Sequence, residues 1–255
     1  MIKDSLKLFY RLLKPVFDPF RLIKVLPSYI SFIKDLRMFK YLDQGSSLKL
    51  GDIFPCLFNK GNKTIIDPHY FYQNIWAFKL IIESKVSEHV DVGSKADFVG
   101  MLSAVTRVTF IDIRPLEVDI DNFNSKAGSI LSLPYPDKSV NSLSCLHVVE
   151  HIGLGRYGDP IDPEGPKKAA KELMRVLAPG GNLYFSLPIG IPKLCFNAHR
   201  IYSPFEILDM FKRLKLKEFS SISDDGKFVR FSNIESFCQA RYSCGLFLFK
   251  APVQE

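Results

Sequence analysis

Apolar and polar positions change their period several times between residues 88 and 251. Short apolar runs bounded by glycine, proline or charged residues predict strands at 88–93, 107–115, 142–149, 182–190, 216–223 and 244–251, with a short one inside 127–136. Apolar side chains at helical spacing predict helices over 96–105, 166–181 and 203–214. Strands that alternate with helices of this length predict an α/β fold in which helices cover both faces of a parallel sheet.

A further helix is predicted just before this region. Asp67 is a suitable N-cap and Pro68 suits the first helical position, so we expect a helix that runs to about Ser84. Its predicted buried side chains include Tyr72, Ile75, Phe78, Leu80 and Ile82.

The first 40 residues carry a basic amphipathic pattern. On a helical wheel of about 100° per residue, basic side chains share one sector and apolar side chains occupy the other side. The basic set is Lys3, Lys7, Arg11, Lys14 and Arg21, and the apolar set is Leu6, Phe9, Leu12, Leu13, Val16 and Phe17. We expect Pro15 and Pro19 to break this helix and Pro27 to separate it from a second one at 28–40.

Two interpretations of this segment stay open. A basic, aromatic-rich amphipathic helix is typical of proteins that lie on an anionic membrane surface. Alternatively, the apolar face packs on the main domain or on a second subunit. We divide the chain into a basic helical N-terminal extension, residues 1–66, and an α/β domain, residues 67–255.

Composition narrows the class of protein. Most of the formal net charge of +7 belongs to residues 1–40, so we expect no nucleic-acid partner. Residues 1–40 show no signal-peptide pattern and the chain has no apolar run of membrane-spanning length. The five scattered cysteines form no CxxC, which favours reduced thiols in the cytoplasm and no zinc site.

Four stretches of the α/β region occur in a recognisable order: HVDVGS, FIDIRP, LPYPDKSVNSLSCLHVVEHI and ELMRVLAPGGNLYFSLP. Together they resemble the class I S-adenosylmethionine-dependent methyltransferases over about residues 86–190. The resemblance implies a Rossmann-like, doubly wound, mostly parallel seven-stranded sheet and S-adenosylmethionine as cofactor. DVGS…DIRPL, VEHIGLGRYGDPIDPEG and FNAHRIY are also similar to a branch catalogued as a domain of unknown function in nematode and bacterial proteins. Some bacterial members of that branch are associated with surface-glycan synthesis genes.

The resemblance assigns a cofactor site at the carboxyl ends of the strands. Gly93 lets the backbone approach the cofactor, and Asp112 can accept hydrogen bonds from the ribose hydroxyls. The positions that meet the adenine ring in the family are Ser129 and Ile130 here. For each residue, turn geometry or packing is the alternative. The predicted cofactor-binding residues are Asp91, Gly93, Ser94, Asp112, Ile113, Ser129, Ile130, Leu146 and His147.

The first loop departs from the family pattern. Lys95 and Asp97 stand where the family usually has its second and third glycines, and Ser129 replaces the usual aspartate. These substitutions leave open a methyltransferase fold that no longer binds cofactor.

The segment GLGRYGDPIDPEGP, residues 153–166, follows the fourth strand. Carboxylates beside an aromatic ring suit a polyhydroxylated substrate, and an arginine can hold a phosphate or carboxylate. We therefore predict a wall of the substrate site; the alternatives are a rigid surface turn or an oxygen-rich metal site. The predicted substrate-binding residues are Arg156, Tyr157, Asp162 and Arg200, and we assign no metal.

Methyl transfer to oxygen requires removal of a proton, a task suited to histidine. His151 and His199 lie on the expected rim, and structural hydrogen bonds are the alternative for each. Adjacent residues on a helix do not face each other, so we do not expect Glu150 to orient His151. The predicted catalytic residues are His151, His199 and Asp159.

These observations predict an S-adenosylmethionine-dependent methyltransferase that O-methylates a hydroxyl of a sugar or glycan. The expected acceptor is a surface polysaccharide or lipid-linked saccharide, met by the basic helix at the inner membrane face. The alternative is a non-catalytic protein of the same fold that binds a membrane or a partner. An RNA methyltransferase is a third interpretation, which the position of the excess charge disfavours.

Overall fold

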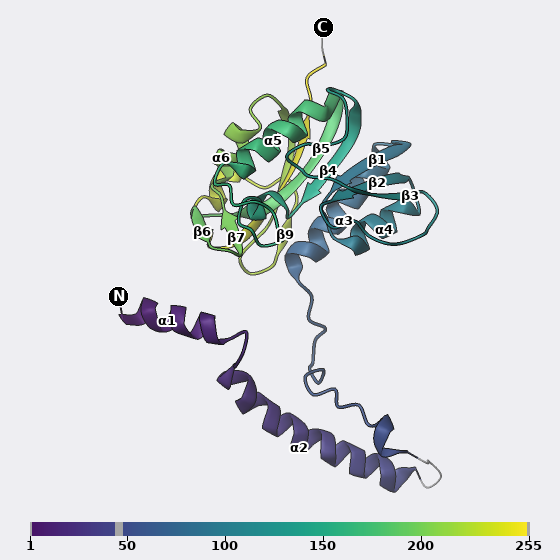
Figure 1. Cartoon of the computed structure of the whole chain (residues 1–255), viewed down its shortest axis with the longest axis vertical. Helices are drawn as coiled ribbons and strands as arrows, with labels where there is room; N and C mark the ends of the chain where they lie inside the picture. Colours follow the sequence, from purple (N-terminus) through teal and green to yellow (C-terminus); the bar gives the residue numbers. More distant parts are fainter. Residues whose placement is uncertain (1, 44–47, 254–255) are drawn as a thin grey trace. The chain divides into compact units, whose positions relative to one another are not determined.

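The computed structural model describes residues 2–43 and 48–253, and the chain divides after Ile65 into two units (Figure 1). The N-terminal unit contains α1 (Ile2–Leu13), α2 (Pro19–Leu42) and a 3₁₀ turn at Leu50–Asp52. In the part of the chain described, none of the helices is both long and apolar enough to span a membrane.

The two N-terminal helices differ from the expected pair. The break falls between Leu13 and Pro19, as predicted, but Pro19 begins α2 because Asp18 caps it, with Oδ1 accepting hydrogen bonds from the N–H groups of Phe20 and Arg21. Pro27 lies inside α2, so the predicted separation there is wrong. A proline removes one backbone hydrogen bond, and the 24-residue helix continues across it.

The second unit is built on an eight-stranded sheet in the order β3-β2-β1-β4-β5-β10-β8-β9 (Figure 1). Neighbours from β3 to β5 run parallel, and β10 runs antiparallel to both β5 and β8. The strands are β1 (Glu88–Val92), β2 (Arg107–Asp112), β3 (Phe123–Ala127), β4 (Val140–Leu146), β5 (Leu177–Ile189), β8 (Lys215–Ile222), β9 (Phe228–Val229) and β10 (Ser243–Lys250). The predicted doubly wound, mostly parallel sheet is confirmed, with the two-residue β9 added at the edge beyond the expected seven strands.

Helices cover both faces of this sheet because strand residues alternate between them. Leu183 and Phe185 of β5 pack in the core formed with α5 (Gly165–Val176) and α6 (Pro204–Met210). Tyr184 points to the opposite core, formed with α3 (Pro68–Glu83) and α4 (Ala96–Ser103). A separate two-stranded hairpin, β6 (Lys193–Cys195) and β7 (His199–Ile201), follows β5.

The α3 helix begins as predicted, since Asp67 Oδ1 accepts hydrogen bonds from the N–H groups of His69 and Tyr70 at 3.0 and 3.4 Å. Its buried face agrees with the expected one only in part: Tyr72, Phe78 and Leu80 pack against the core as predicted. Ile75 and Ile82 are exposed, whereas the buried residues are His69, Gln73, Trp76, Ala77 and Ile81. The orientation suits Trp76, whose Nε1 donates a hydrogen bond to Glu218 Oε1 at 2.9 Å.

Two predicted boundaries are also wrong. The third strand precedes the stretch 127–136 instead of lying in it, and that stretch forms turns held by a bridge between Ser129 and Ser132. The helix predicted over 166–181 ends at Val176, where β5 starts. Pro179 disfavours a helical conformation at Ala178, and Leu177 already pairs with Val140 of β4.

Candidate functional site

The first turn of the site follows β1 and is built around Gly93. Its φ of +69° lies in the left-handed region that favours glycine. A Cβ at this position would lie 3.2 Å from Cγ1 of Val148 and 3.5 Å from Oδ2 of Asp112. The ends of β1, β2 and β4 therefore meet closely around Gly93, and a side chain at this position would crowd Val148.

Asp91 and Ser94 lie beneath this turn and fix its shape. Asp91 Oδ1 accepts a hydrogen bond from the Ser94 N–H at 3.0 Å, and Oδ2 accepts from the hydroxyls of Ser94 (2.6 Å) and Ser144. The Ser94 hydroxyl accepts in turn from the N–H of Leu146 at 3.1 Å. Burial raises the pKa of Asp91 to about 6. Asp91, Ser94 and Leu146, three of the nine predicted cofactor-binding residues, are buried and support the turn from below.

Asp112 ends β2 and faces the Gly93 turn. Its side chain is 19% exposed, and Oδ1 accepts a hydrogen bond from the Arg114 N–H at 2.7 Å. None of the described residues donates a hydrogen bond to Oδ2, the oxygen nearest Gly93. Ile113 is exposed beside it. One carboxylate oxygen is thus fixed by backbone while the other can accept from a hydroxyl group.

Lys95, one of the departures from the family pattern, is directed toward α3. Its Nζ lies over the ring of Tyr70, 3.4 Å from the centroid, as in a cation–π contact. The second departure, Asp97, is exposed in the first turn of α4.

The two predicted adenine contacts are placed differently. Ile130 is buried in the core shared with α5, while Ser129 is half-buried and its hydroxyl accepts a hydrogen bond from the Leu131 N–H at 3.2 Å. Of these two residues, Ser129 is therefore the one with surface accessible to a ligand.

The segment after β4 carries three buried ionisable side chains. His147 has a φ of +57°, and its N–H donates to the Ser186 carbonyl at 2.9 Å. Burial lowers the pKa of His147 well below its usual range and raises the pKa of Glu150 to about 8. Neither carboxyl oxygen of Glu150 has a hydrogen-bond partner among the described residues. A buried, neutral carboxyl group without partners is uncommon outside functional sites.

His151 is held in one tautomer by its surroundings. Its Nδ1 lies 2.6 Å from the Ala198 carbonyl, which can only accept, so Nδ1 carries the proton and Nε2 keeps a lone pair. Nε2 lies 3.7 Å from Glu150 Oε1. Glu150 and His151 come this close because Val149–His151 form a single 3₁₀ turn instead of an α-helix, but the Ala198 carbonyl, and not Glu150, holds the ring. Burial lowers the pKa of His151 to about 4.

Asp159 and Asp162 hold the loop 153–166 in shape. Asp159 Oδ2 accepts from the Gly153 N–H at 2.6 Å. Asp162 Oδ1 accepts from the Glu164 N–H at 3.0 Å, and its Oδ2 pairs with Lys168 Nζ at 2.7 Å. The structure thus gives both predicted carboxylates a local role in the loop.

Tyr157 connects this loop to two strand ends. Its ring meets the ring of His151 edge-on at 5.5 Å, and the guanidinium of Arg114 lies 4.5 Å from its centroid. The guanidinium of Arg156 lies 5.0 Å from the same centroid and donates a hydrogen bond to the Ala198 carbonyl at 2.9 Å. The loop therefore spans from the end of β2 to the region after β4.

Arg200 and His199, on the β6–β7 hairpin, lie at the same rim. Arg200 donates a hydrogen bond to the Ile152 carbonyl at 2.7 Å, which supports the backbone after β4. The His199 ring lies 5.1 Å from that of Tyr242, and burial lowers its pKa.

Several residues at this edge were not predicted from the sequence. Besides Glu150 and Arg114 they are His69, Tyr70, Tyr202, Tyr242 and Cys244. Arg114, Glu150 and Tyr202 lie within the quoted motifs without having been singled out as site residues, whereas no local motif marks the others, because α3 and β10 reach the edge only through the order of the sheet. The N-cap at Asp67 was the one available signal, since it fixes where α3 begins.

Solved structures with the same architecture are methyltransferases or close to them in fold. The N-methyltransferase NodS from Bradyrhizobium japonicum WM9, in complex with S-adenosyl-L-homocysteine, has a TM-score of 0.53 and 16% identity, with 78% of this chain and 92% of that chain covered. The [4+2]-cyclase SpnF has a TM-score of 0.54 and 15% identity, with 71% and 82% covered. The sheet order and these likenesses define a protein with the class I methyltransferase fold.

The sequence places the chain more narrowly. Residues 92–235 match the family described as "Caenorhabditis protein of unknown function, DUF268", and the chain belongs to this family. No curated protein matches the sequence. The resemblances to the superfamily and to this branch are thereby confirmed.

Proposed function

We propose that this protein is an S-adenosylmethionine-dependent methyltransferase. The observation that carries the proposal is the turn at Gly93, which bears no side chain and faces Asp112 Oδ2, 3.5 Å from the position that a Cβ would take. A bare turn beside a carboxylate at the end of the next strand suits a nucleoside ligand, whose ribose can donate two hydrogen bonds. Lys95 lies over Tyr70, so its charge is also available to a ligand carboxylate near α3.

The residues present fit the cofactor at this place. Asp112 would hold the ribose, Gly93 would lie against the amino-acid portion, and Ile113 and Ser129 would flank the base. When bound, S-adenosylmethionine supplies an electrophilic methyl group. The chain itself must then orient the acceptor, exclude water and remove one proton.

His151 is the best-placed group to take that proton. Its Nδ1–H is engaged by the Ala198 carbonyl, so Nε2 is free to accept. The neutral carboxyl group of Glu150, whose Oε1 lies 3.7 Å from Nε2, would present a polar group to the imidazole as it gains positive charge. The acceptor hydroxyl group would become a methyl ether, and its proton would pass to Nε2 of His151.

We propose a hydroxyl of a sugar or glycan as the acceptor. Tyr157 offers a ring for stacking on a sugar face, and it stands beside His151. Arg114 and Arg156 flank the same ring, which favours a saccharide that carries a phosphate or carboxylate. A lipid-linked saccharide fits this description.

The N-terminal unit supports the membrane part of this proposal. Leu6, Phe9 and Leu12 of α1 are exposed, and Lys7 and Arg11 are exposed on the same helix. Such a helix can place its apolar side chains among lipid chains and its cations among anionic head groups.

A transfer assay tests the enzymatic proposal. The full chain is incubated with methyl-labelled S-adenosylmethionine and total saccharide, lipid and RNA fractions. We expect label in the saccharide or lipid-linked saccharide, and its loss in His151→Ala. Label in RNA alone, or equal transfer by His151→Ala, would refute the assignment.

A non-catalytic role is the second candidate, and one observation favours it. The [4+2]-cyclase SpnF shares this fold, so the fold does not by itself fix methyl transfer. A chain that binds vesicles but neither binds S-adenosyl-L-homocysteine nor transfers label would belong to this second class.

A further inference from the structure

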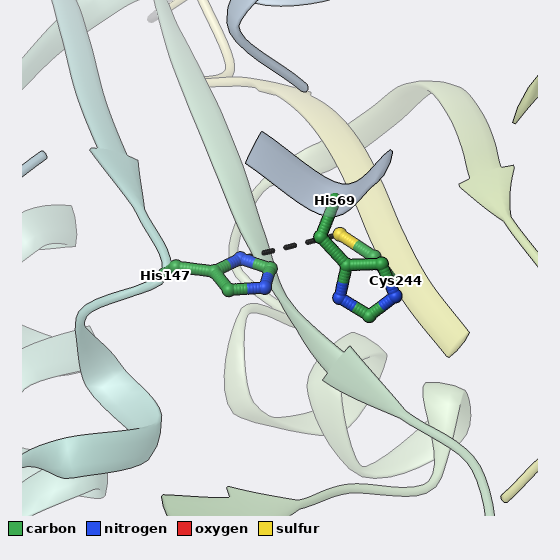
Figure 2. A group of neighbouring side chains, drawn as sticks. All are labelled: His69, His147 and Cys244. Atoms are coloured by element: carbon green, nitrogen blue, oxygen red, sulfur yellow. Dashed lines mark hydrogen bonds between the residues drawn. The ribbon is translucent and has the colours of Figure 1, made fainter. Parts of the chain in front are cut away.

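Three side chains of types that can bind metals lie together at the start of α3, after β4 and in β10. Figure 2 shows His69, His147 and Cys244, and one donor atom from each lies within 4.8 Å of the others. Nδ1 of His147 lies 4.0 Å from Sγ of Cys244. Two imidazoles and one thiol are a ligand set typical of zinc sites.

Rigid elements hold each of these side chains. His69 is the second residue of α3, whose first turn is fixed by the Asp67 cap. Cys244 lies in β10 between Pro188 of β5 and Ile222 of β8. His147 follows β4 at a φ of +57°. A non-glycine residue held in this region costs of order 1–3 kcal/mol, and such strain clusters at functional sites.

The polar groups of the cluster are incompletely satisfied. The Nε2 atom of His147 is buried and has no hydrogen-bond partner among the described residues. Its Nδ1 lies 3.4 Å from the Ser186 hydroxyl, which donates to Gln73 Oε1 at 2.7 Å. A buried ring nitrogen without a protein partner calls for an explanation, and a bound ion is one.

We propose that His69, His147 and Cys244 bind one Zn²⁺ ion in a tetrahedral site whose fourth ligand is water. Zinc–nitrogen distances of about 2.0–2.1 Å and a zinc–sulfur distance of about 2.3 Å would require the three donors to approach by roughly 1 Å. Binding replaces the thiol proton of Cys244 by the metal, and that proton passes to solvent. Oxygen-seeking ions such as Mg²⁺ do not suit this donor set.

The surroundings of the cluster agree with a cation. Burial raises the pKa of the Cys244 thiol, and the carboxyl groups of Glu150 and Asp67 are close enough to raise it further, and so to attract a cation. Burial lowers the pKa of the His147 ring, and Lys95, a positive charge near it, has the opposite effect to the carboxyl groups and lowers that pKa further. The ring of Tyr242 stacks on His69 at 5.1 Å and covers one side. The ion would tie α3 to β4 and β10, and so steady the wall that carries Tyr70 and Lys95.

Cobalt substitution tests the proposal on the full chain. The purified protein is stripped with a chelator and titrated with Co²⁺, which gives a thiolate charge-transfer absorption when a cysteine is bound. We expect one equivalent of Co²⁺, displaced by Zn²⁺, and no such absorption in Cys244→Ser. Cys238→Ser, which changes a cysteine outside the cluster, should keep it. Absence of the absorption in the wild type, or its persistence in Cys244→Ser, overturns the proposal.

A second measurement covers the case in which the buried Cys244 variant does not fold. Zn²⁺ should raise the melting temperature of the stripped wild-type chain and leave that of His69→Gln unchanged. An equal rise in both overturns the proposal. Neither readout depends on S-adenosylmethionine, so methyl transfer and zinc binding can fail separately.

Discussion

Gly93 adopts a backbone conformation that few other residues tolerate, and its neighbours stand where a side chain would lie. The same position faces the oxygen of Asp112 that the backbone leaves free. Both the stability of the turn and the proposed ligand binding therefore require a residue without a side chain at position 93.

Gly93→Ala should lower the free energy of unfolding by about 1–3 kcal/mol, because alanine is strained at a φ of +69°. Urea denaturation measures the change. Gly100→Ala is the matched control: Gly100 lies in α4, and nothing lies within 4 Å of the position that its added methyl group would take, so alanine should raise stability by about 0.5–1 kcal/mol. A Gly93→Ala chain as stable as the wild type would contradict this account of the turn.

Glu150 predicts a specific pH dependence. Its pKa is raised to about 8 in the folded chain, against about 4.3 when unfolded. Between these values the folded state keeps a proton that the unfolded state has lost, so stability falls as the pH rises. The slope contributed by Glu150 approaches about 1.4 kcal/mol per pH unit, roughly between pH 5 and 7, and falls to about half of that at pH 8 and toward zero above it.

Glu150→Gln removes this contribution. Urea unfolding of both chains at several pH values should show the variant gaining on the wild type as the pH rises through this window. A difference between the two chains that does not change with pH would show that the carboxyl group is not held neutral.

At the scale of elements, the loop 153–166 joins strand ends that are distant in the sequence. Asp159 and Asp162 accept the hydrogen bonds within the loop. Tyr157 and Arg156 instead contact residues outside it, Arg114 and the Ala198 carbonyl. The loop is thus both a folded turn and a wall beside His151.

Asp159→Ala should loosen this loop, because the Gly153 N–H loses a charged acceptor at 2.6 Å. We expect a loss of about 1.5–3 kcal/mol in stability and faster amide exchange at Gly153. Glu164→Ala, which removes an exposed ion pair with Lys167, serves as the control and should change stability by less than about 1 kcal/mol. Equal exchange at Gly153 in both variants would contradict the role given to Asp159.

Local patterns sufficed for most elements of the α/β unit. The Asp67 cap, the capping box at Ser203 and the apolar runs of β1, β2, β4 and β10 all gave elements near their predicted places. The glycines at 180 and 181 predict the end of the preceding helix there, but β5 already begins at Leu177, where pairing with β4 starts. Tertiary pairing decided that boundary, and local propensity did not.

The residues of the candidate site were predictable only where they lie within short sequence motifs. Gly93, Asp112 and His151 come from motifs, and the structure brings their strand ends together. The cluster of His69, His147 and Cys244 could not be predicted, because its members meet through the sheet order and lie far apart in the chain. Burial of Asp91, Ile130 and Leu146 was equally hidden, since sequence does not show which side of a turn a residue occupies.

At the scale of the whole molecule, the chain joins a basic N-terminal unit to a methyltransferase-fold unit. The N-terminal unit exposes apolar and basic side chains on α1. If it binds membranes, it would keep the second unit near lipid-linked acceptors.

Charge reversal in α1, and at Lys14 just after it, tests this arrangement. The triple variant Lys7→Glu, Arg11→Glu, Lys14→Glu should bind anionic vesicles at least about 100-fold more weakly, since each basic residue near such a surface contributes about 1 kcal/mol and each glutamate is repelled by it. Vesicle sedimentation measures the change. The control reverses three exposed charges of the second unit, Lys212, Arg213 and Lys215. Equal binding by the α1 variant and the wild type would contradict the membrane proposal.

The most direct test of the central claim is the affinity of the full chain for S-adenosyl-L-homocysteine, measured by titration calorimetry. We expect one binding site, weakened about 10- to 100-fold in Asp112→Ala through the loss of hydrogen bonds to a charged acceptor. Asp119→Ala, an exposed carboxylate after the same strand, should bind like the wild type. No heat with the wild-type chain, or equal affinity in Asp112→Ala, would contradict the account.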